Sequence, residues 1–321
     1  MKVVVLDFES LAPDKLDLSS LDKLQKSYGL HITYFDATAP EQVIERATDA
    51  QIILVNKVQL TRATLCKLSK LKYIGVLATG TNNIDMEYCQ QNDIQVKNVE
   101  GYGTSSVIQH AFTLLLNLST SLIQYANDVQ HGKWQKSRQF CFLDYPINTL
   151  EGKTIGILGY GELGQAMASI ARTFGMKVIV LNRPGNQTSS ATDDVTRVPF
   201  YQGLEQLDVL SLHCLLSEQT KEIIDRKVLS AMKPSAFLIN TARGGLVNET
   251  DLAQALQNKE IAGAGLDVLS TEPPNQDNPL LQISLPNLII TPHTAWGAVE
   301  ARQKLLHLVV GNLKDWLESR N

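Results

Sequence analysis

The stretch Thr154–Gly164, Thr-Ile-Gly-Ile-Leu-Gly-Tyr-Gly-Glu-Leu-Gly, decides which fold the sequence predicts. It joins a short apolar strand to glycines in the spacing Gly-x-Gly-x-x-Gly, and the small and apolar residues of Gln165–Phe174 continue it as a helix. Gly159 permits a tight turn, Gly161 lets a pyrophosphate approach the backbone, and Gly164 lets the helix pack closely on the strand. The helix amino terminus receives the phosphate charge. Because the turn stands between a strand and a helix, it predicts dinucleotide binding.

Short apolar runs alternate with helix-length amphipathic stretches along the whole chain, which is typical of parallel βαβ units. We therefore expect an α/β protein with two doubly wound parallel sheets, a smaller flavodoxin-like one and a Rossmann one. The smaller sheet is predicted from the apolar runs Val3–Leu6, Ile32–Phe35, Ile52–Val55, Tyr73–Leu77 and Gln95–Val99. The larger sheet is predicted from Thr154–Leu158, Lys177–Leu181, Val209–His213, Phe237–Asn240, Gly263–Leu266 and Leu288–Thr291.

Helices are expected between these strands and after them. A long helix is predicted from about Ser105 to His131, and the polar stretch Pro184–Asp194 is expected to be a loop. Shorter helices and an irregular arm are predicted at Pro40–Ala47, Thr61–Leu68 and Gly132–Leu150. The last helix, about Ala298–Glu318, is expected to cross back onto the first domain, because apolar residues recur in it at helical spacing: Leu305, Leu308, Val309, Leu313 and Trp316.

Composition narrows the class of protein. A chain of 321 residues exceeds what one hydrophobic core usually supports, so two domains are expected. A net charge of −4 gives no electrostatic reason to expect nucleic acid or a membrane as a partner, and no apolar run approaches the roughly 20 residues of a membrane helix. The first residues resemble a strand more than a signal peptide, so we expect a cytoplasmic location. No Cys-x-x-Cys pair occurs among Cys66, Cys89, Cys141 and Cys214, which indicates neither a disulfide framework nor a zinc site.

The residues that follow the strand Lys177–Leu181 bear on the choice of coenzyme. An Asp or Glu usually stands here to bond the adenosine ribose, whereas this chain has Asn182 and Arg183. An arginine at this point can grip a 2′-phosphate, or it can stack on adenine or point to solvent. We therefore expect NAD(P)H as the cofactor and leave the preference open. A strong preference for NADH would require another acid, for example from the loop around Asp193.

Three residues of catalytic type stand just past the ends of three strands. Arg243 follows Phe237–Asn240, Glu272 follows Gly263–Leu266, and His293 follows Leu288–Thr291. Each alone would be read as a surface or structural residue. The carboxyl ends of parallel strands meet at one edge of a sheet, and ligands of such sheets bind there. The sequence therefore predicts an active site at this edge.

The chemistry assigns a role to each residue. Arg243 offers a planar set of donors for a carboxylate and a polarised carbonyl. His293 suits proton transfer to the carbonyl oxygen as a hydride reaches the carbon. A neighbouring carboxylate, Glu272, favours the imidazolium and orients the ring. This combination indicates reversible reduction of a small 2-keto acid, with no metal required.

These motifs resemble the D-isomer-specific 2-hydroxyacid dehydrogenases over essentially the whole chain, and within that family the glycerate dehydrogenases, also called hydroxypyruvate reductases. The resemblance rests on the glycine turn and on residues 77–85, 240–247, 264–268 and 291–296. It implies reduction of hydroxypyruvate, possibly also glyoxylate, to D-glycerate or the corresponding D-2-hydroxy acid. It also implies a homodimer formed by the long helix and the irregular arm.

The resemblance further implies binding roles and domain boundaries. The substrate domain should comprise residues 1–100 and 292–321, and the NAD(P)-binding domain residues 101–291. Substrate binding is implied for Ala78, Thr79, Gly80, Arg243 and His293. Asp267 should bond the nicotinamide carboxamide. The other cofactor contacts are implied at Gly159, Gly161, Glu162, Leu163, Gly164, Asn182, Arg183, Cys214, Leu215, Thr241, Ala242, Arg243, His293 and Trp296.

Two alternatives use the same scaffold. Co-repressor-like relatives bind the dinucleotide to control assembly, and they share the region around the three catalytic residues. A short D-3-phosphoglycerate dehydrogenase is the other alternative, although the sequence shows no basic cluster near Ala78–Thr81 for a phosphate. The sequence leaves open which keto acid is preferred and which direction is physiological.

Overall fold

A computed structural model describes residues 1–185, 190–191 and 195–320 of the chain. The chain forms two compact units. The first comprises Met1–Gly103 and Trp296–Asn321, and the second comprises Thr104–Ala295. Both boundaries lie a few residues beyond those predicted at 100 and 291, so the segment that carries His293 stays with the second unit.

The first unit is built on a parallel five-stranded sheet in the order β2-β1-β3-β4-β5. This order is that of flavodoxin-like folds, as predicted. Each strand overlaps a predicted apolar run: β1 (Lys2–Val5), β2 (His31–Tyr34), β3 (Ile52–Val55), β4 (Tyr73–Val76) and β5 (Gln95–Lys97).

Side chains alternate between the two faces of this sheet, because successive residues of a strand point to opposite sides. Val3 and Val5 pack with one set of helices, and Val4 packs with the other. The first set is α1 (Ser19–Tyr28) and α11 (Val299–Glu318). The second set is α2 (Val43–Ala47), α3 (Arg62–Leu65) and α4 (Met86–Gln91).

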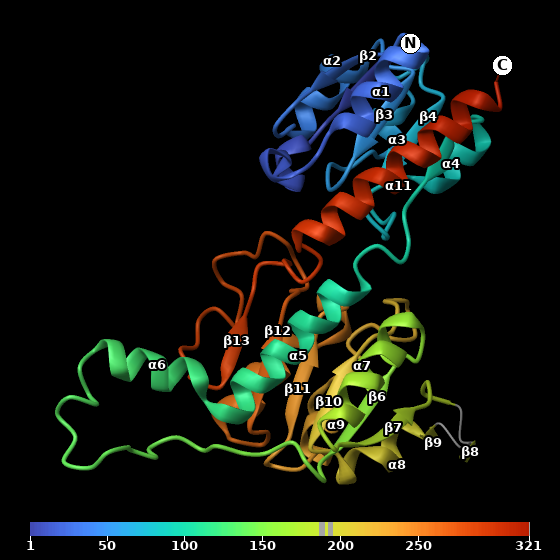
Figure 1. Cartoon of the computed structure of the whole chain (residues 1–321). Coiled ribbons are helices and arrows are strands. Elements are labelled where there is room, and N and C mark those ends of the chain that lie inside the picture. The colour runs from blue at the N-terminus through green and yellow to red at the C-terminus, as the bar shows by residue number, and fades with distance from the viewer. Residues whose placement is uncertain (186–189, 192–194, 321) are drawn as a thin grey trace. The chain divides into compact units, whose positions relative to one another are not determined.

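Helix α11 packs on the first sheet, as the sequence predicts (Figure 1). Leu305, Leu313 and Trp316 are buried there. The prediction for Leu308 was wrong, because its side chain is 39% exposed, whereas the neighbouring Leu306 is buried. The buried face of the helix therefore includes Leu306 and Val310 and excludes Leu308.

The second unit is built on a sheet whose described strands run in the order β13-β12-β11-β10-β6-β7-β9-β8. The strands from β13 to β9 are parallel, and β8 pairs antiparallel with β9. The order reverses at β6, as in a Rossmann fold. The bounds are β6 (Thr154–Leu158), β7 (Lys177–Leu181), β8 (Ser190–Ala191), β9 (Thr196–Val198), β10 (Val209–Leu212), β11 (Phe237–Asn240), β12 (Gly263–Leu266) and β13 (Leu288–Ile290).

The sequence did not predict β8 or β9, which are too short to show a strand pattern. The expected polar loop Pro184–Asp194 contains β8, and residues 186–189 and 192–194 of this loop lie outside the described part of the chain.

Helices cover both faces of this sheet (Figure 1). One face carries α5 (Thr104–Thr120) and α7 (Glu162–Thr173), and Ile155 and Ile157 of β6 are buried against them. Leu158 points to the opposite face, which carries α8 (Phe200–Gly203), α9 (Arg226–Ala231) and α10 (Glu249–Gln257). The central strands are thus buried on both sides, which explains their unbroken apolar sequences.

The predicted long helix is in fact two helices, α5 and α6 (Leu122–Gln130), bent by 66°. Ser121 stands between them with a left-handed backbone, φ 52°, and its hydroxyl donates a hydrogen bond to the carbonyl of Pro146. This contact with a distant segment fixes the break, and periodicity along the helix does not reveal it. Among the described helices, none is by itself long and apolar enough to cross a membrane, although α5 and α6 reach that length together.

Candidate active site

The glycine turn joins β6 to α7 at the carboxyl edge of the second sheet. Gly159 has φ +96°, and a Cβ atom there would lie 2.5 Å from the backbone nitrogen of Cys214, so only glycine fits. A Cβ at Gly164 would lie 2.1 Å from the carbonyl oxygen of Gly159, which shows how closely the helix packs on the turn. At Gly161 a Cβ would meet no described atom within 4 Å. This open side at a helix amino terminus fits a pyrophosphate.

The first turn of α7 supplies two more of the predicted residues. Glu162 is exposed and accepts a hydrogen bond from the hydroxyl of Thr104 on α5. Leu163 is half-buried and packs against the apolar cluster beneath α7. The turn is therefore supported by α5 as well as by the sheet.

The tip of β7 presents arginine where an acid often stands. Asn182 is buried, and its backbone N–H donates to the carbonyl of Val198 at 2.9 Å. Arg183 is exposed. On the neighbouring β9, the Arg197 guanidinium lies 5.3 Å from the ring centroid of Tyr160 in the glycine turn. Two cations thus stand near this tip, and sequence reasoning found only one of them. Asp193 lies outside the described residues.

The turn after β11 holds Arg243 through the side chain of a buried asparagine. Asn240 accepts a hydrogen bond from the N–H of Ala242 at 3.0 Å and donates one to the carbonyl of Arg243 at 2.9 Å. A Cβ at Gly244 would lie 1.9 Å from the carbonyl carbon of Leu269. The arginine turn is therefore pressed against the backbone of the loop that leads to Glu272.

Glu272 and His293 form a close pair at this edge. The Glu272 Oε2 atom lies 2.6 Å from His293 Nδ1, and Oε1 accepts from the N–H of Leu269 at 3.0 Å. A carboxylate can only accept, so the imidazole proton of this pair sits on Nδ1. The side chains are partly accessible, 27% exposed for His293 and 37% for Glu272.

A buried aspartate anchors the segment that carries His293. The Asp267 carboxylate accepts hydrogen bonds from the N–H groups of Thr294 at 2.9 Å and Ala295 at 2.8 Å, and from the hydroxyl of Thr291 at 2.5 Å. Its carbonyl accepts from the N–H of His293 at 2.8 Å. The Asp267 side chain is fully enclosed, with 0% of its surface exposed. The direct hydrogen bond from Asp267 to the nicotinamide carboxamide stays a prediction. His293 itself has a left-handed backbone, φ 53°.

The residues that follow β10 include an exposed leucine and a buried histidine. Leu215 is 81% exposed at this edge. Burial raises the pKa of the Cys214 thiol, and the charge of Arg183 opposes that rise. Burial also lowers the pKa of His213 to about 4. Its Nε2 lies 2.9 Å from the Ser211 hydroxyl, while Nδ1 has no hydrogen-bond partner among the described residues.

The remaining predicted residues fall in two places. Thr241 and Ala242 lie in the arginine turn of the second unit; Thr241 is buried, and its hydroxyl has no hydrogen-bond partner among the described residues. Ala78, Thr79 and Gly80 follow β4 in the first unit. There the Thr79 hydroxyl donates to the carbonyl of Val99 at 2.9 Å.

Trp296 also belongs to the first unit, where it packs against the apolar cluster beneath α11. The predicted site residues are thus divided between the two units.

Sequence reasoning missed Asn240, Arg197 and His213 and gave Asp267 another role. Asn240 and His213 each stand at the end of a predicted strand, so the rule that found Arg243 could also have found them. Arg197 had no such signal, because β9 was not predicted. Among the described residues, no cluster of three His, Cys, Asp or Glu side chains could hold a metal ion.

A Rossmann sheet with an open glycine turn, and with an arginine and a histidine–carboxylate pair at the same edge, defines a nicotinamide-dependent dehydrogenase. Comparison with known proteins agrees. The sequence model of the D-isomer-specific 2-hydroxyacid dehydrogenase family, NAD-binding domain, matches residues 112–295. The chain therefore belongs to the D-isomer-specific 2-hydroxyacid dehydrogenases, a family of NAD(P)-dependent oxidoreductases.

Similar proteins cover nearly the whole chain. A hydroxypyruvate reductase of Blautia hydrogenotrophica is 39% identical over 99% of this chain and 97% of its own. A glycerate dehydrogenase of Methylorubrum extorquens is 40% identical over 95% of this chain and 96% of its own. The solved NADPH-dependent glyoxylate/hydroxypyruvate reductase of Sinorhizobium meliloti, in complex with NADP and malonate, has a TM-score of 0.81 at 29% identity and covers 98% of this chain and 93% of its own. The family and fold class predicted from the sequence are confirmed.

Proposed function

We propose that this protein reduces hydroxypyruvate to the D-2-hydroxy acid, with His293 as the general acid. Glyoxylate is proposed as a second substrate with a lower kcat/KM. The observation that carries the proposal is the 2.6 Å contact between Glu272 Oε2 and His293 Nδ1, at the same sheet edge as Arg243 and the open glycine turn. Relatives of 39% and 40% identity named hydroxypyruvate reductase and glycerate dehydrogenase support the choice of substrate.

Each residue acts through its ordinary chemistry. Glu272 holds the Nδ1 proton and stabilises the charged ring, so that Nε2 donates its proton to the carbonyl oxygen of the keto acid. Arg243 binds the substrate carboxylate with two parallel donors and polarises the carbonyl. In the oxidative direction, neutral Nε2 of His293 accepts the hydroxyl proton. The backbone around Ala78–Gly80 is proposed to bind the substrate carboxylate as well.

The cofactor is proposed to bind along the carboxyl edge of the second sheet. The reduced nicotinamide supplies the hydride when bound. The open face of Gly161 and the amino terminus of α7 fit the pyrophosphate, and the exposed Leu215 offers an apolar surface for a ring. Arg183 and Arg197 stand where a 2′-phosphate would be recognised, which supports use of NADPH as well as NADH.

The test is an assay that follows coenzyme oxidation by the absorbance of the reduced nicotinamide at about 340 nm. The four keto acids to compare are hydroxypyruvate, glyoxylate, pyruvate and phosphohydroxypyruvate. We expect the highest kcat/KM with hydroxypyruvate, then glyoxylate, and little turnover with pyruvate. A preference for phosphohydroxypyruvate would indicate a phosphoglycerate dehydrogenase instead. Tight coenzyme binding without turnover of any keto acid would contradict the enzymatic proposal and favour a dinucleotide-sensing binding protein.

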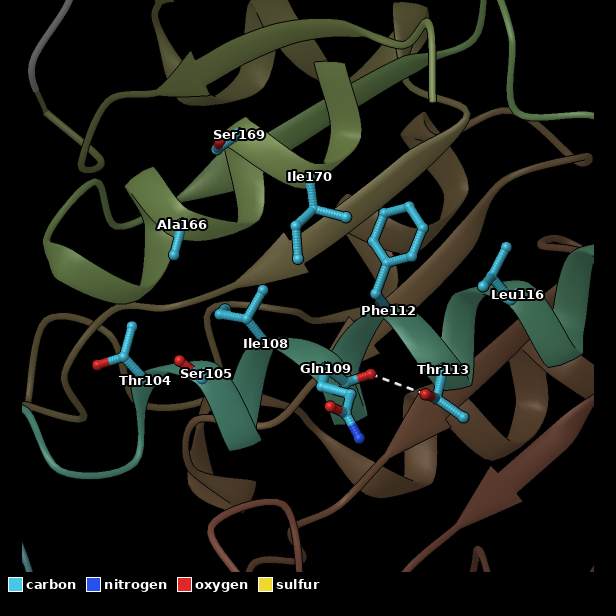
Figure 2. Close-up of a pocket in the computed structure, with 10 residues that line it drawn as sticks. All are labelled: Thr104, Ser105, Ile108, Gln109, Phe112, Thr113, Leu116, Ala166, Ser169 and Ile170. Carbon is cyan, nitrogen blue, oxygen red and sulfur yellow. Dashed lines mark hydrogen bonds between the residues drawn. The ribbon is translucent and has the colours of Figure 1, made fainter. Parts of the chain in front are cut away.

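We further propose that the protein is a cytoplasmic homodimer. A cavity of about 560 Å³ opens between α5 and α7 (Figure 2), and Phe112, Leu116 and Ile170 line it together with polar residues. Beyond it, α6 and the arm expose several large apolar side chains: Leu122, Ile123, Val129, Trp134, Phe140, Leu143 and Ile147. Exposed apolar side chains gathered on one arm are typical of an interface between subunits.

Sedimentation equilibrium tests the dimer. We expect twice the 35.5 kDa mass of the chain and a shift toward the monomer in Ile123→Asp. Tyr201→Ala, which changes an exposed aromatic side chain on α8, is the matched control. A monomeric wild-type protein would contradict this proposal and leave the catalytic one standing.

A further inference from the structure

His110 lies on α5, one helical turn after Ser106, and both side chains reach the segment that carries His293. The Ser106 hydroxyl donates to the carbonyl of Ala295 at 2.6 Å. The His110 Nε2 atom lies 2.8 Å from the Thr291 hydroxyl. Residues four apart share one face of a helix. This face of α5 therefore holds both ends of the 291–295 segment.

The direction of the hydrogen bonds follows from the donors available. The Thr291 hydroxyl has one proton and lies 2.5 Å from Asp267 Oδ1, which can only accept. The proton of the hydroxyl therefore points at Asp267, and its oxygen accepts from His110 Nε2–H. His110 Nε2 also lies 3.4 Å from Asp267 Oδ1. His110 donates in this arrangement whether its ring is neutral or charged.

Asp267 passes the constraint on to both sides of the catalytic histidine. It accepts from the N–H groups of His293, through its carbonyl, and of Thr294 and Ala295, through its carboxylate. His293 has φ 53°, a left-handed conformation that is unfavourable for a residue with a Cβ atom. Such a conformation persists only where the surroundings fix it. The hydrogen bonds from α5 and Asp267 are those surroundings.

We propose that His110 is a positioning residue of the reaction, which fixes the backbone of His293 through Thr291 and Asp267. This rests on the proposed function, in which His293 is the general acid. The contacts of His110 are with Thr291 and Asp267, so it acts on the position of the His293 Nε2 atom through them. Small displacements of a catalytic group lower the rate more than they lower binding.

The experiment compares His110→Ala, His110→Gln and Thr291→Val in the full-length protein. Gln keeps an N–H donor near the position of Nε2, and Val removes the hydroxyl that relays the contact. We expect His110→Ala to lower kcat about 10- to 100-fold while the Kd for NADH, measured by fluorescence, stays near wild type. His110→Gln should recover most of kcat. His307→Ala, an exposed histidine on α11, is the matched control.

Two further readouts separate positioning from simple stability. The double variant His110→Ala/Thr291→Val should lose no more kcat than the worse single variant, because both break one chain of hydrogen bonds. Amide hydrogen exchange of Thr294 and Ala295 should speed up in His110→Ala, whether or not the protein turns over a keto acid. Unchanged exchange, additive losses, or a Gln variant no better than Ala would overturn the proposal. Faster amide exchange in His110→Ala, together with a wild-type protein that turns over no keto acid, would instead contradict the proposed function and leave the positioning role of His110 standing.

Discussion

Two buried aspartates, one in each unit, use the same device to different ends. Asp7 follows β1 and accepts hydrogen bonds from the N–H groups of Asn56, Lys57 and Val58 at 2.8, 2.5 and 3.2 Å. Asp267 follows β12 and accepts from Thr294, Ala295 and a threonine hydroxyl. In each case the aspartate stands at a strand end and holds the loop that follows the neighbouring strand, β3 or β13.

The two loops differ in what they carry. The loop held by Asp7 has no left-handed residue, and Asn83 braces it further by donating to the carbonyls of Asn56 and Val58. The segment held by Asp267 carries the left-handed His293 and is gripped again from α5. A buried carboxylate that gathers backbone N–H groups is thus a structural device in itself. It bears on chemistry only where the loop presents a catalytic side chain.

The largest expected effect comes from removing that side chain. We predict that His293→Ala lowers kcat by about 100- to 10,000-fold, the usual contribution of a positioned general acid. Binding of NADH should be largely retained, because Asp267 still holds the segment through backbone groups. Stopped-flow or steady-state assays with hydroxypyruvate measure the loss. A His293→Ala variant that kept half of the wild-type kcat would show that His293 is not the general acid. The segment held by Asp267 would then have a structural role only, like the loop held by Asp7.

The second largest expected effect is a loss of stability in acid, which should be greater in the second unit than in the first. The pKa of His213, in the second unit, is lowered by burial to about 4, against about 6.5 for an exposed histidine. The unfolded state then binds the proton more tightly, so stability is lost as the pH falls from about 6.5 to about 4. The loss is up to about 3 kcal/mol, since each pKa unit is worth about 1.4 kcal/mol. The described histidines of the first unit, His31 and His307, are exposed.

Urea unfolding at several pH values between about 7 and 4 measures how the free energy of unfolding changes with pH. Amide hydrogen exchange then assigns this slope to one of the two units. We expect the second unit to open first as the pH falls. His213→Asn, which cannot titrate, should flatten the slope. A slope equal to that of the wild type would show that carboxylates, and not His213, govern acid stability.

Matched substitutions at the two aspartates sharpen the comparison directly. Asn in place of Asp keeps one acceptor but turns an NH₂ group toward a backbone N–H, at a cost of about 1–3 kcal/mol. We predict that Asp267→Asn lowers kcat about 10- to 100-fold because His293 is displaced. Asp7→Asn should lower the free energy of unfolding of the first unit while kcat is largely retained. The reverse pattern in paired assays of kcat and urea stability would contradict the division of roles.

The contrast between the two aspartates also shows what the sequence can predict. Strands such as Ile52–Val55 were found without error because they are buried on both faces and read as unbroken apolar runs. Arg243, Glu272 and His293 could be predicted as one site because the topology brings strand ends together, and the structure places Glu272 and His293 in contact. The break at Ser121 was not found, because a contact with Pro146 decides it. The anchoring role of Asp267 was not found either, because its partners belong to the next strand's loop.

The smallest expected effect is the choice of coenzyme. Asn182 is neutral and buried, so no charge at that residue repels a 2′-phosphate, while Arg183 and Arg197 stand near the same tip. Without an acid, the ribose hydroxyls of NADH lose one anchor, but the pyrophosphate and nicotinamide contacts remain. We predict that kcat/KM for NADPH and NADH agree within about tenfold, or about 1.4 kcal/mol. Arg197→Ala should shift the ratio toward NADH, as Arg183→Ala should, whereas Arg62→Ala, an exposed arginine of the first unit, should not. A preference for NADH beyond about a hundredfold in the wild type would require an acid near the adenosine ribose, and Asp193 would be the first to substitute.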